Sequence, residues 1–90
     1  MSTTPTQDDI LAAIRDELTE IKVPGAQDAG PDSTWADLDV DSLDLVEVVK
    51  ALEDRFEIQI ADGRLKGIES VGDAIALVQE LVTERAGARA

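Results

Sequence analysis

The residue with the clearest chemical meaning is a lone serine flanked by acids, Ser42, within the segment Leu38–Asp44 that reads LDVDSLD. A serine becomes a catalytic nucleophile only beside a general base, which in proteins is most often histidine. The chain contains no histidine and no cysteine. We therefore expect Ser42 to be a place where a group is attached, and we predict that the chain is not an enzyme.

Ser42 lies where a loop gives way to an amphipathic helix, which the apolar spacing predicts over residues 42–56. The first turn of a helix has free N–H groups and the positive end of the dipole, so it favours a bound or attached phosphate. We expect Asp41 to be the N-cap and Asp44 to be the third helical residue, which leaves the Ser42 hydroxyl pointing outward. The simpler alternative is that Ser42 itself caps the helix, a contribution of about 1 kcal/mol.

The helix predicted over residues 42–56 has two different faces. Its core face consists of Leu45, Val48, Val49, Leu52 and Phe56. Leu43 and Val46 lie on the opposite side, where the core does not need them and acids surround them. Two apolar side chains beside an attachment serine predict a surface that other proteins contact.

Composition narrows the class of protein. Ninety residues predict one domain, residues 1–90. Without cysteine or histidine the usual zinc ligands are missing, so we expect no metal site. The net charge of −12 repels nucleic acid and anionic membranes and suits basic protein partners. No apolar run is long enough to span a membrane and no signal-peptide pattern is present, so we expect a cytoplasmic protein. We also expect it to be a monomer.

A first helix is predicted near the N-terminus. Thr4 can cap it, Pro5 fits its first turn, and Gln7 can reach back as in a capping box. It should end within residues 19–22, because Val23 precedes a proline and is pushed toward extended geometry. Its apolar stripe consists of Ile10, Leu11, Ile14, Leu18 and Ile21.

The connections differ from the helices in composition. Residues 24–41 are rich in glycine, proline and aspartate and predict a long loop, with Trp35 as a plug in the core and Leu38 as a second anchor. Residues 58–60 alternate but have no partner strand, so we expect an extended connection. Residues 62–66 predict one short helical turn that stops at a glycine.

The last helix completes an all-α fold. Ser70 and Asp73 form an S-x-x-D capping box, and residues 1–3 and 86–90 are expected to fray. The buried face of this helix is predicted to contain Ala74, Ile75, Val78, Leu81 and Val82. The predicted fold is a four-helix bundle of three longer helices and a short third helix, with the long loop between helices one and two.

The segment Leu38–Leu43 resembles the L-G-x-D-S-L attachment motif of the acyl carrier protein family. The similarity continues through residues 44–56 and includes residues 58–60 and 70–74. Trp35 stands where the family often has an aromatic residue. The resemblance covers nearly the whole chain, and it implies a free-standing carrier with the helical fold described above.

The resemblance also implies a cofactor and partners. A phosphopantetheinyl transferase would move 4′-phosphopantetheine from coenzyme A to Ser42, and the thiol of the arm would hold acyl chains as thioesters. Ketosynthases, acyltransferases and other acyl-processing enzymes would bind the second helix through basic patches. Glu53 is one of the acids in this helix that match those of the family. The partner-binding residues implied are Asp41, Leu43, Asp44, Val46, Glu47, Lys50 and Asp54.

Four positions depart from the family pattern. Asp39 replaces the usual glycine, Lys50 stands where many fatty-acid carriers have an apolar residue, and Gly63 and Arg64 stand where those carriers tend to have acids. These departures favour polyketide or other specialised biosynthesis, with a fatty-acid synthase carrier as the close alternative. A peptidyl carrier fits less well, because such carriers are less acidic.

Two other classes of protein share some of these sequence features. Asp37, Asp39 and Asp41 resemble the start of an EF-hand loop, but Ser42 and Val48 occupy its glycine and glutamate positions, so no calcium loop is expected. A small acidic helical adaptor with no prosthetic group, phosphorylated at Ser42, explains the acids. It does not explain the exposed apolar residues beside the serine.

Overall fold

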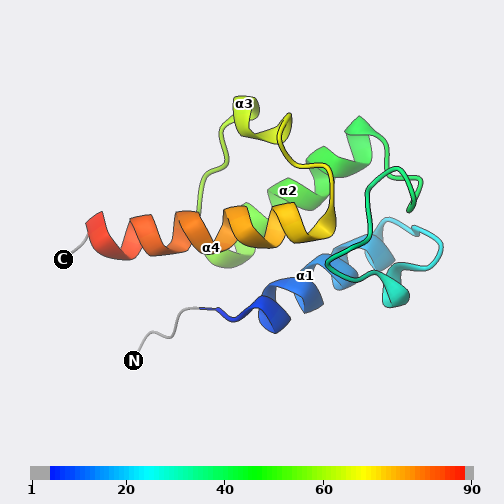
Figure 1. The fold of residues 1–90 in the computed structure, drawn as a ribbon, viewed down its shortest axis with the longest axis horizontal. Coiled ribbons are helices and arrows are strands. Elements are labelled where there is room, and N and C mark those ends of the chain that lie inside the picture. Colours follow the sequence, from blue (N-terminus) through cyan, green and yellow to red (C-terminus); the bar gives the residue numbers. More distant parts are fainter. Residues whose placement is uncertain (1–4, 89–90) are drawn as a thin grey trace.

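The computed structural model describes the backbone of residues 5–88 and the side chains of residues 5–61 and 63–84. Within this range the elements, all of them helical, are α1 (Gln7–Glu20), the 3₁₀ turn η1 (Ala26–Asp28), α2 (Ser42–Phe56), α3 (Asp62–Leu65) and α4 (Val71–Ala88) (Figure 1). The predicted all-α fold with a short third helix is confirmed, whereas the turn η1 within the long loop was not expected.

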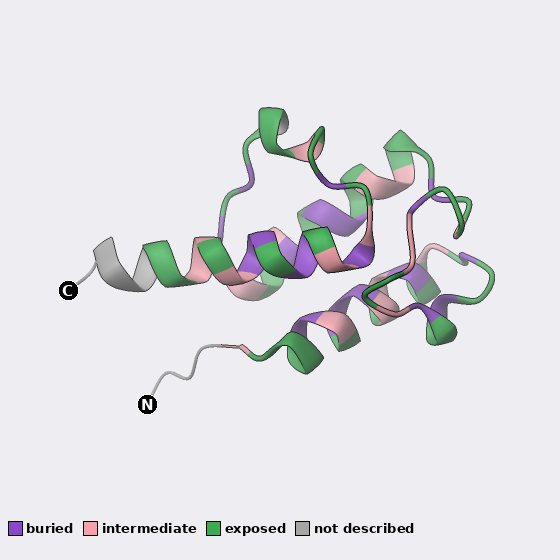
Figure 2. Cartoon of the chain, viewed as in Figure 1, coloured by how far each residue is buried: buried purple, intermediate pink, exposed green. Residues whose placement is uncertain are grey.

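Three helices enclose one core. α1 packs against both α2 and α4, and α2 also packs against α4, while α3 stands on the connection above them (Figure 1). The buried faces of these helices turn inward (Figure 2). The fully buried larger side chains are Ile10, Ile14 and Leu18 of α1, Val48 and Leu52 of α2, and Val71 and Val78 of α4. Each predicted apolar stripe therefore contributes to the core, and α4 also adds Leu77. The predicted residues that are only partly buried and pack against the core are Leu11, Ile21, Leu45, Phe56, Leu81 and Val82.

The start of α1 differs from the prediction. Thr6 is the N-cap: its hydroxyl accepts the N–H of Asp9 at 3.1 Å, and the Asp9 carboxylate accepts the N–H of Thr6 at 3.0 Å. The capping box is thus Thr6 and Asp9, and the prediction that Gln7 completes it was wrong, because Gln7 is the first helical residue. Thr4 lies outside the described residues. The helix ends at Glu20, within the predicted range.

The other helix boundaries lie close to those predicted from the sequence. α2 spans the predicted residues, and α3 is the short turn expected before Gly67. The Ser70 hydroxyl accepts the N–H of Asp73 and the Asp73 carboxylate accepts the N–H of Ser70, each at 3.2 Å, so the predicted box is present. α4 continues through Ala88, beyond residue 85 where we expected its order to end. Residues 1–3 and 89–90 lie outside the described part.

The long loop is tied to the start of α4. Thr34 and Ser70 form an isolated antiparallel bridge. Three backbone N–H groups donate across the same boundary, Trp35 to Glu69 (3.2 Å), Val71 to Ser33 (2.8 Å) and Gly72 to Pro31 (2.9 Å). A Cβ atom at Gly72 would lie 2.7 Å from the Pro31 carbonyl oxygen, so this close approach requires glycine.

The described helices include none with the length and apolar character that a membrane crossing requires.

Candidate functional site

Ser42 is the first residue of α2, and its neighbour performs the capping. Asp41 is the N-cap, and its Oδ1 atom accepts the N–H of Asp44 at 2.9 Å. Ser42 is exposed, and its hydroxyl makes no hydrogen bond within the described part of the chain. The alternative that Ser42 caps the helix is therefore wrong, and its hydroxyl is free for attachment.

The turn before Ser42 orients it. Asp39 has a left-handed backbone with φ 59°, and the next residue, Val40, is buried and donates its N–H to the Trp35 carbonyl at 2.9 Å. The chain thus enters the core at Val40 and leaves it at Asp41. The family's usual glycine adopts such a conformation freely, and aspartate is among the few other residues that tolerate it.

Trp35 anchors this turn from inside. Its side chain is 5 % exposed and belongs to the core, as the interpretation of a loop plug predicted, and Leu38 packs against the same core. The indole Nε1–H has no hydrogen-bond partner within the described residues. The loop is therefore held by packing of the indole and by the backbone bonds of residue 35.

The outward face of α2 carries the two exposed large apolar side chains of the described chain. Leu43 is 78 % exposed and Val46 is 38 % exposed, as predicted. Glu47, Lys50 and Asp54 are exposed on the same helix, while Asp41 and Asp44 lie at its start, the first exposed and the second half-buried. The predicted partner residues thus lie on α2 or at its start, with Asp41, Leu43 and Asp44 next to Ser42 and Asp54 near the far end of the helix.

Glu53, one of the acids implied by the resemblance, has a contact within the chain. Its Oε2 atom accepts the N–H of Ile60 at 2.7 Å and fixes the extended connection after α2. The sequence contains no signal for this bond, since it joins residues seven positions apart across a turn. The carboxylate of Glu53 is therefore engaged internally.

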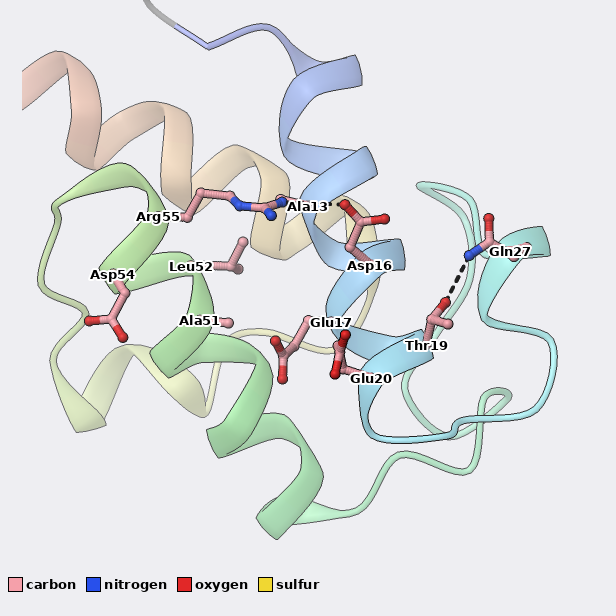
Figure 3. Close-up of a pocket in the computed structure, with 10 residues that line it drawn as sticks. All are labelled: Ala13, Asp16, Glu17, Thr19, Glu20, Gln27, Ala51, Leu52, Asp54 and Arg55. Atoms are coloured by element: carbon pink, nitrogen blue, oxygen red, sulfur yellow. Dashed lines mark hydrogen bonds and ion pairs between the residues drawn. The ribbon is translucent and has the colours of Figure 1, made fainter.

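An acidic cavity of about 610 Å³ lies between α1 and α2 and was not predicted (Figure 3). Arg55 pairs with Asp16 across it, with a nitrogen–oxygen distance of 3.5 Å. The remaining carboxylates that line it are Glu17, Glu20 and Asp54. Ser42 does not line this cavity, which depends on the packing of two helices and so leaves no motif in the sequence.

Glu17 is the titratable group that the cavity perturbs. Burial raises the pKa of its carboxyl above the ordinary value of 4.5, and the charges of Glu20 and Glu47 raise it further. Arg55 acts in the opposite direction. Negative charge is therefore in excess along the seam between α1 and α2.

These features define a class of protein. An exposed hydroxyl without a hydrogen bond, at the start of a helix and beside exposed apolar and acidic side chains, offers a point of attachment and a contact surface. No general base lies next to it, since the chain has no histidine and Asp41 is engaged as the cap. Such a site suits a carrier domain.

Comparison with known proteins shows which carrier proteins this chain resembles. The family described as "Phosphopantetheine attachment site" matches residues 8–78. The meromycolate extension acyl carrier protein of Mycolicibacterium smegmatis is 34% identical over 86 residues, which cover 94% of this chain and 87% of that protein. Its namesake in Mycobacterium bovis is 35% identical over 80 residues (88% and 70%). An acyl carrier protein of Acidothermus cellulolyticus is 37% identical over 70 residues (77% and 83%).

The chain belongs to the acyl carrier protein family. It is a carrier of 4′-phosphopantetheine and has no catalytic activity of its own. Members of this family interact with a phosphopantetheinyl transferase and with acyl-processing enzymes. The resemblance seen in the sequence is thereby confirmed.

Proposed function

We propose that Ser42 is the residue to which 4′-phosphopantetheine is attached. The observation that carries this proposal is the free, exposed hydroxyl of Ser42 at the first position of α2, with Asp41 performing the capping in its place. A transferase can reach this hydroxyl without breaking any hydrogen bond of the fold.

The start of α2 also suits the charge of the attached group. The first N–H groups of a helix have no intrahelical acceptor and lie at the positive end of its dipole. A phosphodiester on Ser42 would place its negative charge there, which is favourable by about 0.3–1 kcal/mol at an exposed helix end. The bound arm supplies a thiol for acyl groups, which the cysteine-free chain lacks.

We infer that the acyl groups belong to fatty-acyl chain elongation. Two of the three relatives reported above are named for meromycolate extension, and their names support this substrate class over the polyketides that the sequence favoured. Arg64, which stands where fatty-acid carriers tend to have an acid, was one of the departures that favoured polyketides. The fold explains this arginine, because it forms an ion pair with Glu80 of α4. Specialised biosynthesis remains the second candidate, and Lys50 favours it.

The partner-binding surface follows from the same geometry. Leu43 and Val46 provide the apolar contact, and Asp44, Glu47 and Asp54 provide negative charge for basic patches on partner enzymes. Exposed charges of this kind mainly raise the association rate, whereas the apolar contact adds affinity that salt hardly changes.

Replacing Ser42 with alanine tests the attachment site. We expect the wild type, incubated with coenzyme A and a broad-specificity phosphopantetheinyl transferase, to gain the mass of one arm. Ser42→Ala should gain none and should keep its helical circular dichroism, because the hydroxyl makes no bond in the fold. Thr83→Ala, which removes an exposed hydroxyl on α4, is the control and should load normally. Undiminished loading of Ser42→Ala contradicts the proposal.

A further inference from the structure

Lys50 is a lone cation on the outward face of α2. It lies one helical turn after Val46 and one turn before Asp54, and it is exposed. Two ion pairs are present in the described chain, Arg55 with Asp16 and Arg64 with Glu80, and Lys50 is in neither.

None of the acids nearest Lys50 on α2 forms an ion pair with it among the described residues, and Glu47 and Asp54 stay exposed. Glu53 bonds the Ile60 N–H, and Asp54 lines the cavity between α1 and α2. Glu47 lies close enough to Glu17 of α1 for its charge to affect that carboxyl. Among the described residues, the ammonium group of Lys50 is therefore left without an ion pair, on the helix that presents Leu43 and Val46.

We propose that Lys50 selects among partner enzymes by requiring an acidic side chain in their docking surface. A surface that is basic throughout would meet Glu47 and Asp54 favourably but would repel Lys50, and like charges brought together discriminate against a wrong partner. The fitting surface has an apolar hollow for Leu43 and Val46, basic groups beside Glu47 and Asp54, and an acid between them.

Helix geometry sets the spacing of this partner surface. At a rise of about 1.5 Å per residue, Lys50 lies about 12 Å along α2 from Ser42, while Glu47 lies about 7.5 Å and Asp54 about 18 Å from it. The partner's acid is thus expected about 12 Å from the point where the arm enters its active site. This inference rests on attachment at Ser42.

The test uses the loaded carrier and a fatty-acid ketosynthase whose docking surface is basic throughout, together with a variant of that enzyme. The variant carries glutamate in place of the basic residue about 12 Å from the mouth of the active-site tunnel, the spacing that helix geometry gives. With the unmodified enzyme, Lys50→Met and Lys50→Glu should each raise kcat/KM by about twofold to fivefold at low salt, the range of a surface charge pair. With the glutamate variant, the wild type should be preferred over Lys50→Glu.

Two controls separate a local effect from bulk charge. Lys50→Arg should behave as the wild type with both enzymes. Lys66→Met removes the same charge from an exposed position away from α2 and should leave the preference between the enzymes unchanged. If Lys66→Met acts like Lys50→Met, or if all loaded variants turn over equally, selection by Lys50 is wrong.

The mass of every variant is measured before its kinetics. A wild type that accepts no arm at Ser42 contradicts the proposed function, and this inference with it. Fully loaded variants that show no charge preference contradict only the role of Lys50.

Discussion

Asp39 holds an unusual backbone conformation directly before the attachment serine. Its φ of 59° places it in the left-handed region, where a side chain normally clashes with the backbone. The residues after it depend on that turn, since Val40 must reach the core and Asp41 must cap α2. The local strain is therefore part of how Ser42 is presented.

Replacing Asp39 with glycine should stabilise the fold. Left-handed geometry costs a residue with a side chain roughly 1–2 kcal/mol, and glycine avoids this cost. Glycine also makes the unfolded chain more flexible, which lowers the free energy of unfolding by about 0.4–1 kcal/mol. We expect Asp39→Gly to raise the free energy of unfolding by about 0.5–1 kcal/mol in urea titrations. Asp39→Asn removes the charge but keeps a side chain and should change little. A glycine variant less stable than the wild type contradicts this view of the turn.

The geometry around Ser42 could largely be predicted from single residues. Asp41 as the cap, Ser42 as an exposed helical residue, and Leu43 and Val46 as exposed apolar residues all follow from helical periodicity and capping chemistry. The Glu53–Ile60 bond could not be predicted, because it depends on how the chain turns after α2. The place of the α1 capping box was also missed, because both Thr4 and Thr6 fit the capping pattern.

The pairing of α1 with α2 creates an acidic seam that is sensitive to pH. Glu17 lies in this seam with a raised pKa, caused first by burial and then by Glu20 and Glu47. A carboxyl with a raised pKa in the folded state favours folding while it is protonated. That contribution is complete below its ordinary value of 4.5 and is lost as the pH rises through the higher folded value.

Glu17→Gln should therefore stabilise the protein at pH 7. The amide carries no charge at any pH, so the variant avoids holding a disfavoured carboxylate in the seam. We expect its Tm at pH 7 to exceed that of the wild type by a few degrees at most, and the difference to vanish below pH 4.5. Glu84→Gln removes an equal charge from an exposed position on α4 and serves as the control. A difference independent of pH, or matched by the control, contradicts the assignment to the seam.

The whole molecule carries far more negative than positive charge. Twenty acids stand against eight bases, so there are too few cations for most carboxylates to have one of their own. Folding brings these charges closer together than they lie in the open chain. Repulsion on this scale is expected to lower stability at low ionic strength.

Salt should raise the Tm of the whole domain. At 0.15 M ionic strength the Debye length falls to about 8 Å, so distant carboxylates cease to repel one another. We expect the Tm at pH 7 to rise when sodium chloride is added to a dilute buffer, as followed by circular dichroism. Magnesium chloride at equal ionic strength distinguishes screening of the carboxylates from bridging between them, since bridging by Mg²⁺ gives a larger rise in Tm. A Tm that falls or stays flat with either salt contradicts the role of repulsion.

The bonds that tie the long loop to α4 have a consequence for the order of folding. They join Thr34 with Ser70, a separation of 70 − 34 = 36 residues, whereas each helix closes its bonds within a few residues. Contacts between distant segments must overcome a larger loss of chain entropy, so they form later than local ones. We expect the helices to be formed before the loop docks on α4. The turn that directs Ser42 outward would then be completed in the last step, and a nascent chain would present no ordered attachment site.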